Sequence, residues 1–425
     1  MTAALLFLGL IVLLLLGVPI AISLGLTSLG FMFTASEDSP IVIAQKLFST
    51  MEHTTLLAIP FFILSSHFLT KGGVSARLIE FAKALVGWMQ GGLAMAGVVA
   101  CMLFAAISGS SPATVVAIGS IMIPGMINAG YDKRYAVGVI ATSGSLGILI
   151  PPSIPMIVYG DAVEESVGKL FIAGILPGIM MTCFLLIATF VVARRMNMPR
   201  EQWQGFGHLA KAFARSFWGL LLIVIVVGGI YGGIFTPTEA AATAAVYSAV
   251  IALFVHKDMG FKDVPKVMLD SAKMTAVLMF IIACAMIFAH VLTEDQIPQK
   301  LAQNMLAQDP SPLMFLLLVN VILWFAGDFM EPSAILLIMA PLFHPIAVKL
   351  GIDPIHLGIV MTTNMEVGMI TPPVGLNLYV AAGLTGMSLT EVTKAALPWM
   401  LVLIVALLVI TYVPWLSLFL VDLMY

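Results

Sequence analysis

Long apolar runs separated by short polar loops set the pattern of this chain. A helix needs about 20 apolar residues to cross the hydrocarbon core of a bilayer, and ten runs come near that length. The predicted crossings are 2–17, 19–35, 54–70, 133–158, 168–196, 216–235, 238–256, 273–292, 354–380 and 398–423. The pattern therefore predicts an all-α protein that crosses a membrane many times.

Two longer apolar stretches, 91–128 and 311–349, are each interrupted in the middle. The interruptions are Ser108–Pro112 and Asp328–Pro332. Each stretch is long enough for two passes, so we predict two re-entrant helical hairpins, each entering and leaving the membrane on one side. Amphipathic segments predicted to lie on the membrane surface are 75–88, 260–270 and 296–307.

Charge and composition agree with a membrane protein and orient it. Of 425 residues, 61% are hydrophobic and only 10% are charged, whereas soluble proteins have about 25% charged residues. Cytoplasmic loops are enriched in Lys and Arg, and here the basic residues divide into fifteen and four. The fifteen are Lys71, Arg77, Lys83, Lys133, Arg134, Arg194, Arg195, Arg200, Lys211, Arg215, Lys257, Lys262, Lys266, Lys273 and Lys394, and the four are Lys46, Lys169, Lys300 and Lys349. We predict that the fifteen are cytoplasmic, and that both termini and the acidic loops 36–40 and 161–166 lie outside.

The two halves of the chain, 1–196 and 216–425, repeat the same landmarks in the same order. The matching positions are Pro112 with Pro332, Pro124 with Pro345, Gly147 with Gly368, and Pro151–Pro152 with Pro372–Pro373, each 220 or 221 residues apart. A basic cytoplasmic linker, 197–215, joins the halves. Each half is predicted to hold five crossings and one hairpin, and because five is odd the second half is inverted. Inverted repeats with broken helices are typical of secondary transporters that bind their cargo near the midplane.

The repeat also bears on the first crossings. It predicts that Gly17–Pro19 turns the chain between two short helices. A single kinked helix over 3–34 is the alternative.

Four breaks in the predicted helices, 108–114, 142–153, 327–334 and 363–377, are rich in Gly, Ser, Thr and Asn. An unpaired backbone group in hydrocarbon costs several kcal/mol, so such breaks persist only where protein, water or an ion satisfies them. Freed carbonyls and side-chain oxygens are hard ligands that suit Na⁺. The helix starts after Pro112 and Pro332 offer N–H groups to a carboxylate.

Basic side chains are missing from both hairpins: no Lys or Arg occurs between Lys83 and Lys133, or between Lys300 and Lys349. A bound anion would then be held by helix dipoles, hydroxyls and bound cations. We therefore expect anion binding to depend on the cation.

Several polar residues near the breaks have two interpretations. Asp328, Glu331 and Glu366 are carboxylates inside the apolar pattern, where such groups are usually functional. Alternatively, each caps local N–H groups beside a water-filled cavity. Ser110 and Ser111 are candidate ligands or N-caps of the following helix. Cys101, Cys183 and Cys284 lie far apart and are interpreted as buried thiols.

At these residues the chain resembles a known family. The segments "SGSSPAT" (108–114), "GYDKRYAVGVIATSGSLGILIPPSIPMIVYG" (130–160), "AGILPG" (173–178), "GIFTPTEAAA" (233–242) and "TPPVGLN" (371–377) resemble the large membrane subunit of TRAP transporters, the tripartite ATP-independent periplasmic carriers. The resemblance implies a bacterial inner-membrane permease subunit, not an enzyme, that imports an organic acid with Na⁺ as the coupling ion and without another cofactor. It implies two partners, a small four-helix membrane subunit and a periplasmic substrate-binding protein.

The resemblance also implies an elevator-type division of the chain. The transport domain would comprise about 91–160 and 311–382, and the scaffold the remainder. The implied sodium-binding residues are Ser108, Ser110, Ser111, Thr114, Ser143, Ser145, Gly147, Asp328, Glu331, Ser333, Asn364, Gly368 and Thr371. The implied substrate-binding residues are Ser110, Ser111, Pro112, Ser153, Glu331, Pro332, Thr371, Pro373 and Asn377.

The implied substrate carries a carboxylate, with sialic acid preferred to a C4-dicarboxylate. The family commonly shows Asp where this chain has Glu331, which leaves the role of that carboxylate open.

Other classes of protein fit the residues less well. A stand-alone Na⁺-coupled divalent-anion symporter would share the repeat and hairpins without needing a binding protein. An ion channel usually forms its pore by oligomeric symmetry, which two inverted hairpins in one chain do not need. An intramembrane protease needs convergent catalytic residues, and no Ser or Asp here has a matching partner. The sequence carries no nucleic-acid-binding signature.

Overall fold

The computed structural model describes residues 2–35, 41, 45, 48–49, 52–307 and 310–425. Within these residues every regular element is a helix, which confirms the all-α prediction. The acidic loop predicted at 36–40 lies outside the described residues.

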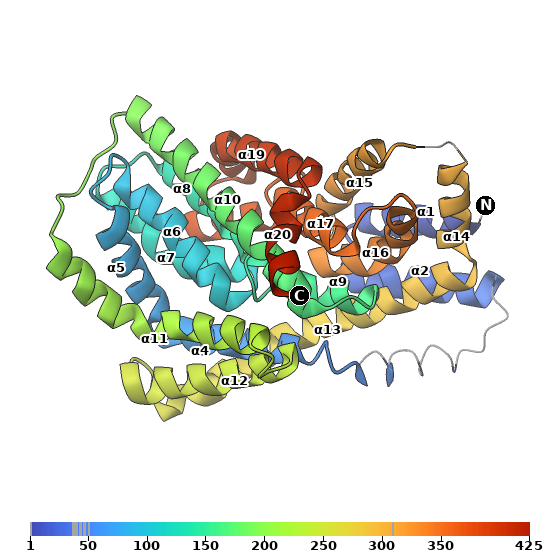
Figure 1. The fold of residues 1–425 in the computed structure, drawn as a ribbon, viewed down its shortest axis with the longest axis horizontal. Coiled ribbons are helices and arrows are strands. Elements are labelled where there is room, and N and C mark those ends of the chain that lie inside the picture. The colour runs from blue at the N-terminus through green and yellow to red at the C-terminus, as the bar shows by residue number, and fades with distance from the viewer. Residues whose placement is uncertain (1, 36–40, 42–44, 46–47, 50–51, 308–309) are drawn as a thin grey trace.

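The described helices of the first half are short, except for the 29-residue α10 (Figure 1). They are α1 Thr2–Leu15, α2 Ile20–Ala35, α4 Ala58–Lys71, α5 Val74–Val86, α6 Gly92–Ser108, α7 Ser111–Asn128, α8 Lys133–Ser143, the 3₁₀ turn η1 Gly144–Ile148, α9 Ile154–Ala162 and α10 Val167–Arg195.

The second half also consists of helices of very different lengths. Its helices are α11 Phe206–Tyr231, α12 Pro237–Val250, the π-helical turn η2 Ile251–His256, the 3₁₀ turn η3 Phe261–Asp263, α13 Val264–Glu294, α14 Ile297–Leu306, α15 Pro312–Gly327, α16 Pro332–Lys349, α17 Pro354–Gly368, α18 Leu376–Thr385, α19 Leu389–Tyr412 and α20 Trp415–Met424.

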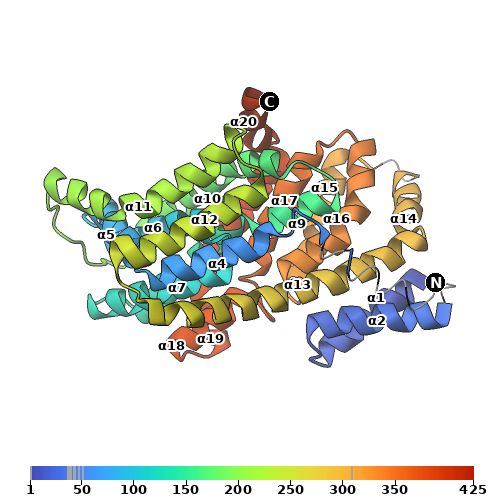
Figure 2. The same ribbon diagram turned by 90° about the horizontal axis from the view of Figure 1, so that it is seen from below.

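The predicted turns and breaks are where the helices end. Gly17 adopts a φ of +78° between α1 and α2, which lie side by side in Figure 2, so the chain forms two short helices rather than one kinked helix. The stretches 91–128 and 311–349 are the helix pairs α6–α7 and α15–α16. In each pair the first helix gives way to the second where the sequence predicts the interruption, at Ser108–Pro112 and at Asp328–Pro332.

At three places the observed helix ends differ from the predicted boundaries. The linker 197–215 is partly helical, because α11 begins at Phe206, directly after Gly205 with its φ of +84°. The surface helix 260–270 and the crossing 273–292 are one helix, α13, since nothing between Lys266 and Lys273 breaks the backbone.

The predicted crossing 398–423 also needs correction, because it contains two helices. A capping box of Ser388 and Glu391 starts α19 nine residues earlier than predicted. Pro414 then separates α19 from α20, since proline restricts the preceding residue and has no N–H to continue the helix.

Helix length and composition agree with membrane crossing. In the part of the chain that the structure describes, seven helices are long and apolar enough to span a membrane, and α7 and α16 are among them. Several predicted crossings, such as 133–158 and 354–380, consist of two shorter pieces separated by a break.

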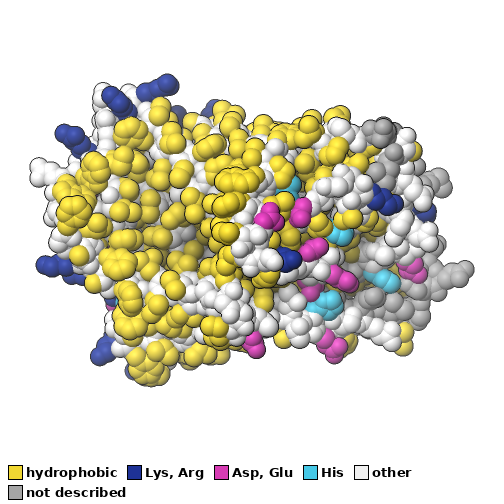
Figure 3. All heavy atoms as spheres, in the orientation of Figure 1, with side chains coloured by type: hydrophobic (Ala, Val, Ile, Leu, Met, Phe, Trp, Pro, Cys, Tyr) yellow, Lys and Arg dark blue, Asp and Glu magenta, His cyan; other side chains and the backbone are white. Residues whose placement is uncertain are grey.

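The surface of the protein is largely apolar, as expected for contact with lipid. On the face in Figure 3, hydrophobic side chains cover most of the molecule, with Lys and Arg around the left end and most acidic side chains in the right half. Cys183 is exposed on α10, which corrects its interpretation as a buried thiol, whereas Cys101 and Cys284 are buried.

The two hairpins lie in opposite halves of the molecule, α6–α7 on the left and α15–α16 on the right of Figure 1. The helix that follows each break packs on the hairpin of the other half, because α9 contacts α16 and α18 contacts α7. Helix α17 lies in the middle and is buried on all sides from Ile355 to Gly368. This packing buries most of the two breaks of the first half, whereas residues 327–331 are half-buried and Pro372 and Pro373 of the fourth break are exposed.

Candidate functional site

The tip of the first hairpin is held by its own hydroxyl groups. Ser108 Oγ lies 2.9 Å from Thr114 Oγ1, and Thr114 Oγ1 donates to Ser110 O at 2.9 Å. Gly109 has a φ of +61°, and a Cβ there would lie 2.8 Å from the Pro152 carbonyl oxygen. Glycine is therefore required for the tip to approach the break in the following helix.

Helix α7 begins without a side-chain cap. Ser110 occupies the N-cap position, but its side chain makes no capping hydrogen bond. Ser111 Oγ instead accepts a hydrogen bond from Asn377 Nδ2 at 2.7 Å. The capping interpretation of these two serines is thus wrong in this conformation. The N–H of Ser110 itself donates to Ser108 Oγ at 3.4 Å.

The break after α8 contains unpaired oxygen atoms. Thr142 Oγ1 and Ser143 Oγ are buried and have no hydrogen-bond partner. Ser145 Oγ donates to Thr142 O at 2.7 Å. A Cβ on Gly147 would lie 2.7 Å from Ser110 O, so this glycine lets the break touch the hairpin tip.

Asn377 joins the second half of the chain to this tip. Its Nδ2 also lies 3.4 Å from Ala141 O, and its buried Oδ1 has no partner. We call residues 108–114, 141–147 and Asn377 the first centre. It gathers several unpaired oxygen donors with no basic side chain among its members.

The tip of the second hairpin is closed by its own carboxylate. Glu331 accepts hydrogen bonds from Ser333 N at 2.9 Å, Ala334 N at 3.2 Å and Ser333 Oγ at 3.0 Å. Glu331 therefore caps α16, as the capping interpretation proposed. Asp328 Oδ1 nearby is buried without a partner.

The break after α17 packs against this second tip. A Cβ on Gly368 would lie 2.8 Å from Gly327 Cα. Asn364 Nδ2 donates to both Asn320 O and Asn320 Oδ1 at 2.9 Å, and Asn364 Oδ1 has no partner. Trp324 Nε1 donates to Thr371 Oγ1 at 3.2 Å. We call residues 327–333, 364–371, Asn320 and Trp324 the second centre.

Glu366 is the most unusual member of the second centre. The residue is fully buried, and neither carboxylate oxygen has a hydrogen-bond partner. An unpaired carboxylate in a dry interior is stable only when a proton or a cation neutralises it.

Some of the expected substrate-binding residues are in contact with one another in the structure, and others are not. Ser111 and Asn377 are in contact, as described above. Ser153 is instead occupied locally, since its hydroxyl donates to Ile148 O and accepts from Met156 N at the start of α9. Pro373 is exposed.

Sequence reasoning missed Asn320 and Trp324. Asn320 is the one polar side chain within the apolar run of α15, which is a signal that could have identified it.

Apolar outer faces, broken helices and buried clusters of unpaired oxygens together define a multi-span helical membrane transporter. Residues 7–416 match the family described as "Tripartite ATP-independent periplasmic transporter, DctM component". The chain belongs to this family and is a transporter permease component, not an enzyme.

Named relatives match along nearly the whole chain. The chain is 57% identical to the C4-dicarboxylate TRAP transporter large permease protein DctM of Pseudomonas aeruginosa, over 93% of each chain. It is 54% identical to the protein of the same name from Vibrio cholerae, over 98% of this chain and 97% of the relative. The sialic acid TRAP transporter permease protein SiaT of Haemophilus influenzae is 34% identical, over 95% of this chain and 66% of the relative.

A solved structure shares the fold. The YdaH transporter of Alcanivorax borkumensis matches with a TM-score of 0.61 and 18% identity, over 90% of this chain and 88% of that chain. At this identity the likeness shows the fold alone.

Proposed function

We propose that this chain is the large permease subunit of a system that imports a C4-dicarboxylate across the bacterial inner membrane. The proposed substrate class rests on sequence identity to named relatives. The relatives named for C4-dicarboxylates are 52–57% identical to this chain, whereas the sialic acid relative is 34% identical. This difference replaces the sequence-based preference for sialic acid.

The proposed partners follow from the tripartite family. A periplasmic binding protein delivers the substrate, and a small membrane subunit joins this chain in the inner membrane. The N- and C-termini are proposed to lie on the periplasmic side, because the larger group of basic residues then lies in the cytoplasm.

Na⁺ is the proposed coupling ion, and the two centres are its proposed sites. The support is chemical: each centre holds buried, unpaired oxygens such as Ser143 Oγ and Asn364 Oδ1. Oxygen donors of this kind suit a hard cation. Without basic side chains in the hairpins, a bound cation would supply the positive charge that an anionic substrate needs.

The proposed seat for a substrate carboxylate is the start of α7. A helix N-terminus carries about half a positive charge, and its first N–H groups lack helical acceptors. At α16 the carboxylate of Glu331 already fills this role, whereas at α7 no side chain does. An incoming carboxylate would replace the missing cap beside Ser111 and Asn377.

Alternating access is proposed to follow an elevator mechanism built on two inverted repeats with re-entrant hairpins. The support is the reciprocal packing of α9 on α16 and of α18 on α7, together with the matching landmarks 220 or 221 residues apart. In this scheme the hairpins and breaks, about 91–160 and 311–382, move together past the remaining helices.

Succinate uptake into proteoliposomes tests the proposal. The vesicles contain this chain and its small membrane subunit, with the binding protein and an inward Na⁺ gradient each present or absent. We expect uptake only when both are present, and we expect sialic acid not to compete. Na⁺-driven uptake without the binding protein would indicate a stand-alone symporter. Gradient-independent flux would indicate a channel.

A further inference from the structure

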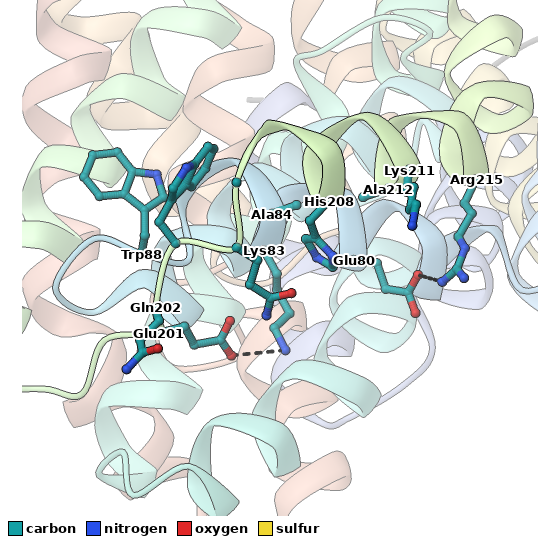
Figure 4. Close-up of a pocket in the computed structure, with 13 residues that line it drawn as sticks. Glu80, Lys83, Ala84, Trp88, Glu201, Gln202, His208, Lys211, Ala212 and Arg215 are labelled. Atoms are coloured by element: carbon teal, nitrogen blue, oxygen red, sulfur yellow. Dashed lines mark ion pairs between the residues drawn. The ribbon is translucent and has the colours of Figure 1, made fainter.

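A polar cavity lies at one end of the molecule, far from both hairpin tips. Its volume is about 370 Å³, and it lies between α5, the segment 201–205 and the first turns of α11 (Figure 4). The fifteen-residue basic group that the charge pattern assigns to the cytoplasm includes Lys83, Lys211 and Arg215 of its lining. None of the proposed transport residues lines it.

The cavity has an excess of cations. Lys83 Nζ lies 3.3 Å from Glu201 Oε1, and Arg215 Nη1 lies 3.5 Å from Glu80 Oε2. Lys211 also lines the cavity and has no ion pair among the described residues. Three cations therefore face two carboxylates, and one positive charge is left uncompensated.

Aromatic side chains beside the cavity indicate that it lies at the headgroup level of the membrane. The rings of Trp88 and Trp203 are 6.1 Å apart, and those of Trp203 and Phe206 are 5.6 Å apart, all on or beside the rim. Trp88, Trp203 and Phe206 are exposed to 48%, 44% and 80%. Exposed Trp beside Lys and Arg is typical of the headgroup region of a membrane.

The two helices that flank the cavity are also consistent with a position at the membrane surface. Lys211 and Arg215 lie near the start of α11, a helix long and apolar enough to span the membrane. Helix α5 is amphipathic, with Leu78 and Ile79 buried and Lys83 on its polar side. The cavity thus opens where a spanning helix meets a surface helix.

We propose that this cavity binds the phosphate group of an anionic phospholipid from the cytoplasmic leaflet. Lys211 supplies the free cation, and Arg215 and Lys83 turn from their carboxylates towards the phosphate. Phosphate is a strong acceptor for both side chains. A lipid fits better than a free phosphate because exposed Phe206, whose ring packs against the lining residue Trp203, offers apolar surface for its acyl chains.

The bound lipid would connect α5 to α11. Helix α5 also contacts α6 of the first hairpin. A headgroup held between α5 and α11 would therefore keep the surface helix at a constant depth beside the hairpin.

Fluorescence quenching tests the proposal without relying on transport. The chain, alone and with its small membrane subunit, is placed in vesicles containing phosphatidylglycerol or phosphatidylcholine brominated near the top of the acyl chains. The signal of interest is the quenching of Trp88 and Trp203 fluorescence, which is obtained as the quenching that is lost in the double variant Trp88→Phe and Trp203→Phe. We expect stronger quenching by the brominated phosphatidylglycerol at equal mole fraction.

Charge variants connect that preference to the cavity. Each basic residue near a membrane surface contributes about 1 kcal/mol to binding an anionic lipid, which is about fivefold in affinity. Lys211→Ala should thus lower the preference for phosphatidylglycerol about fivefold, and Lys211→Arg should retain it. Lys262→Ala, a basic residue of η3 outside the cavity, is the matched control and should change nothing.

Four outcomes would overturn the proposal. They are equal quenching by both lipids, a preference that survives Lys211→Ala, loss of the preference in millimolar inorganic phosphate, and quenching that disappears when the small subunit is added. The third would identify a site for a free anion, and the fourth a protein contact.

Discussion

The two hairpins share a backbone design but differ at the start of their second helix. In both, a proline follows the tip, and a glycine of the facing break lies against the tip backbone. At α16 the carboxylate of Glu331 accepts hydrogen bonds from Ser333 N and Ala334 N. At α7 Ser110 makes no equivalent bond. One helix end therefore carries its own anion, and the other lacks one.

This difference shows how two repeats of one chain can take different roles, one with a permanently capped helix start and one with a helix start open to a ligand. A carboxylate near a helix N-terminus stabilises it by about 0.3–1 kcal/mol at exposed sites and more when partly buried. The second tip has this stabilisation without a ligand. The first tip gains it only when an external anion arrives, so substrate binding is expected to order the first centre more than the second.

The largest expected effect comes from blocking contact between break and tip. Gly147→Ala would place a Cβ 2.7 Å from Ser110 O, a backbone atom that cannot turn aside. Overpacking of this kind costs about 1–3 kcal/mol, so we expect succinate uptake to fall by about fivefold to about 150-fold. Initial uptake rates at matched membrane expression measure this.

The matched control for that variant is Gly383→Ala in α18. A Cβ there has no atom within 4 Å, so transport should be unchanged. Gly368→Ala should resemble Gly147→Ala, since its Cβ would meet Gly327 Cα at 2.8 Å. Wild-type uptake by both variants would show that the close approaches are not needed.

Removing the polar contacts of the first tip should have the next largest effect. Ser110→Ala combined with Ser111→Ala deletes the hydroxyl that pairs with Asn377 Nδ2 and leaves that buried amide short of a partner. Such a loss costs about 1–3 kcal/mol. We expect the Na⁺ concentration for half-maximal uptake to rise about tenfold, with little loss of folded protein.

Ser120→Ala is the control for the serine variant. Ser120 lies on the same helix, and its hydroxyl lies 3.4 Å from Ala117 O, outside the first centre. Unchanged Na⁺ dependence in a well-expressed double variant would reject the first centre as a sodium site.

A moderate effect is expected at the second tip. Glu331→Gln keeps an acceptor for Ser333 N but removes the charge that favours the α16 N-terminus. We expect uptake to fall about threefold to fivefold, which corresponds to the energy of a charged cap. The thermal unfolding temperature in detergent should fall with it.

Glu331→Asp sharpens the comparison between the tips. Aspartate retains the charge and is also a good N-cap, so it should restore uptake towards wild type. A Gln variant with wild-type uptake and stability would make Glu331 a bystander.

The smallest effect is expected at Glu366. Both of its oxygens are buried and unpaired, so the protonated carboxyl is the form best suited to its surroundings. Gln is a neutral isostere of that form, and Glu366→Gln should therefore retain uptake within about twofold. Loss of Na⁺-driven uptake in this variant would instead show that the charged carboxylate holds a cation.

Sequence reasoning succeeded where local chemistry decides the structure. Gly17–Pro19, Ser108–Pro112 and Asp328–Pro332 end helices because of the backbone preferences of their own residues. Boundaries failed where those preferences are weak. Nothing local separates 260–270 from 273–292, and α13 runs through both.

The candidate site was predicted only in part. The breaks supplied Ser111, Asn364 and Asn377 as candidates because small polar residues stand out in an apolar pattern. The same rule applied within α15 would have found Asn320, but Trp324 resembles an ordinary apolar residue. Ser153 was included for its place in a break, yet its hydroxyl is used to start α9.

The sequence by itself determined that this is a multi-span helical membrane protein, where its helices break and which family it belongs to. These properties depend on hydrophobic runs, on proline and glycine, and on local motifs. Only the tertiary structure decided which polar groups pair. Asn377 meets Ser111 across 266 residues, while Ser110 and Glu331 occupy equivalent ends with different partners. Such pairing depends on how distant helices pack, and spacing along the chain does not record it.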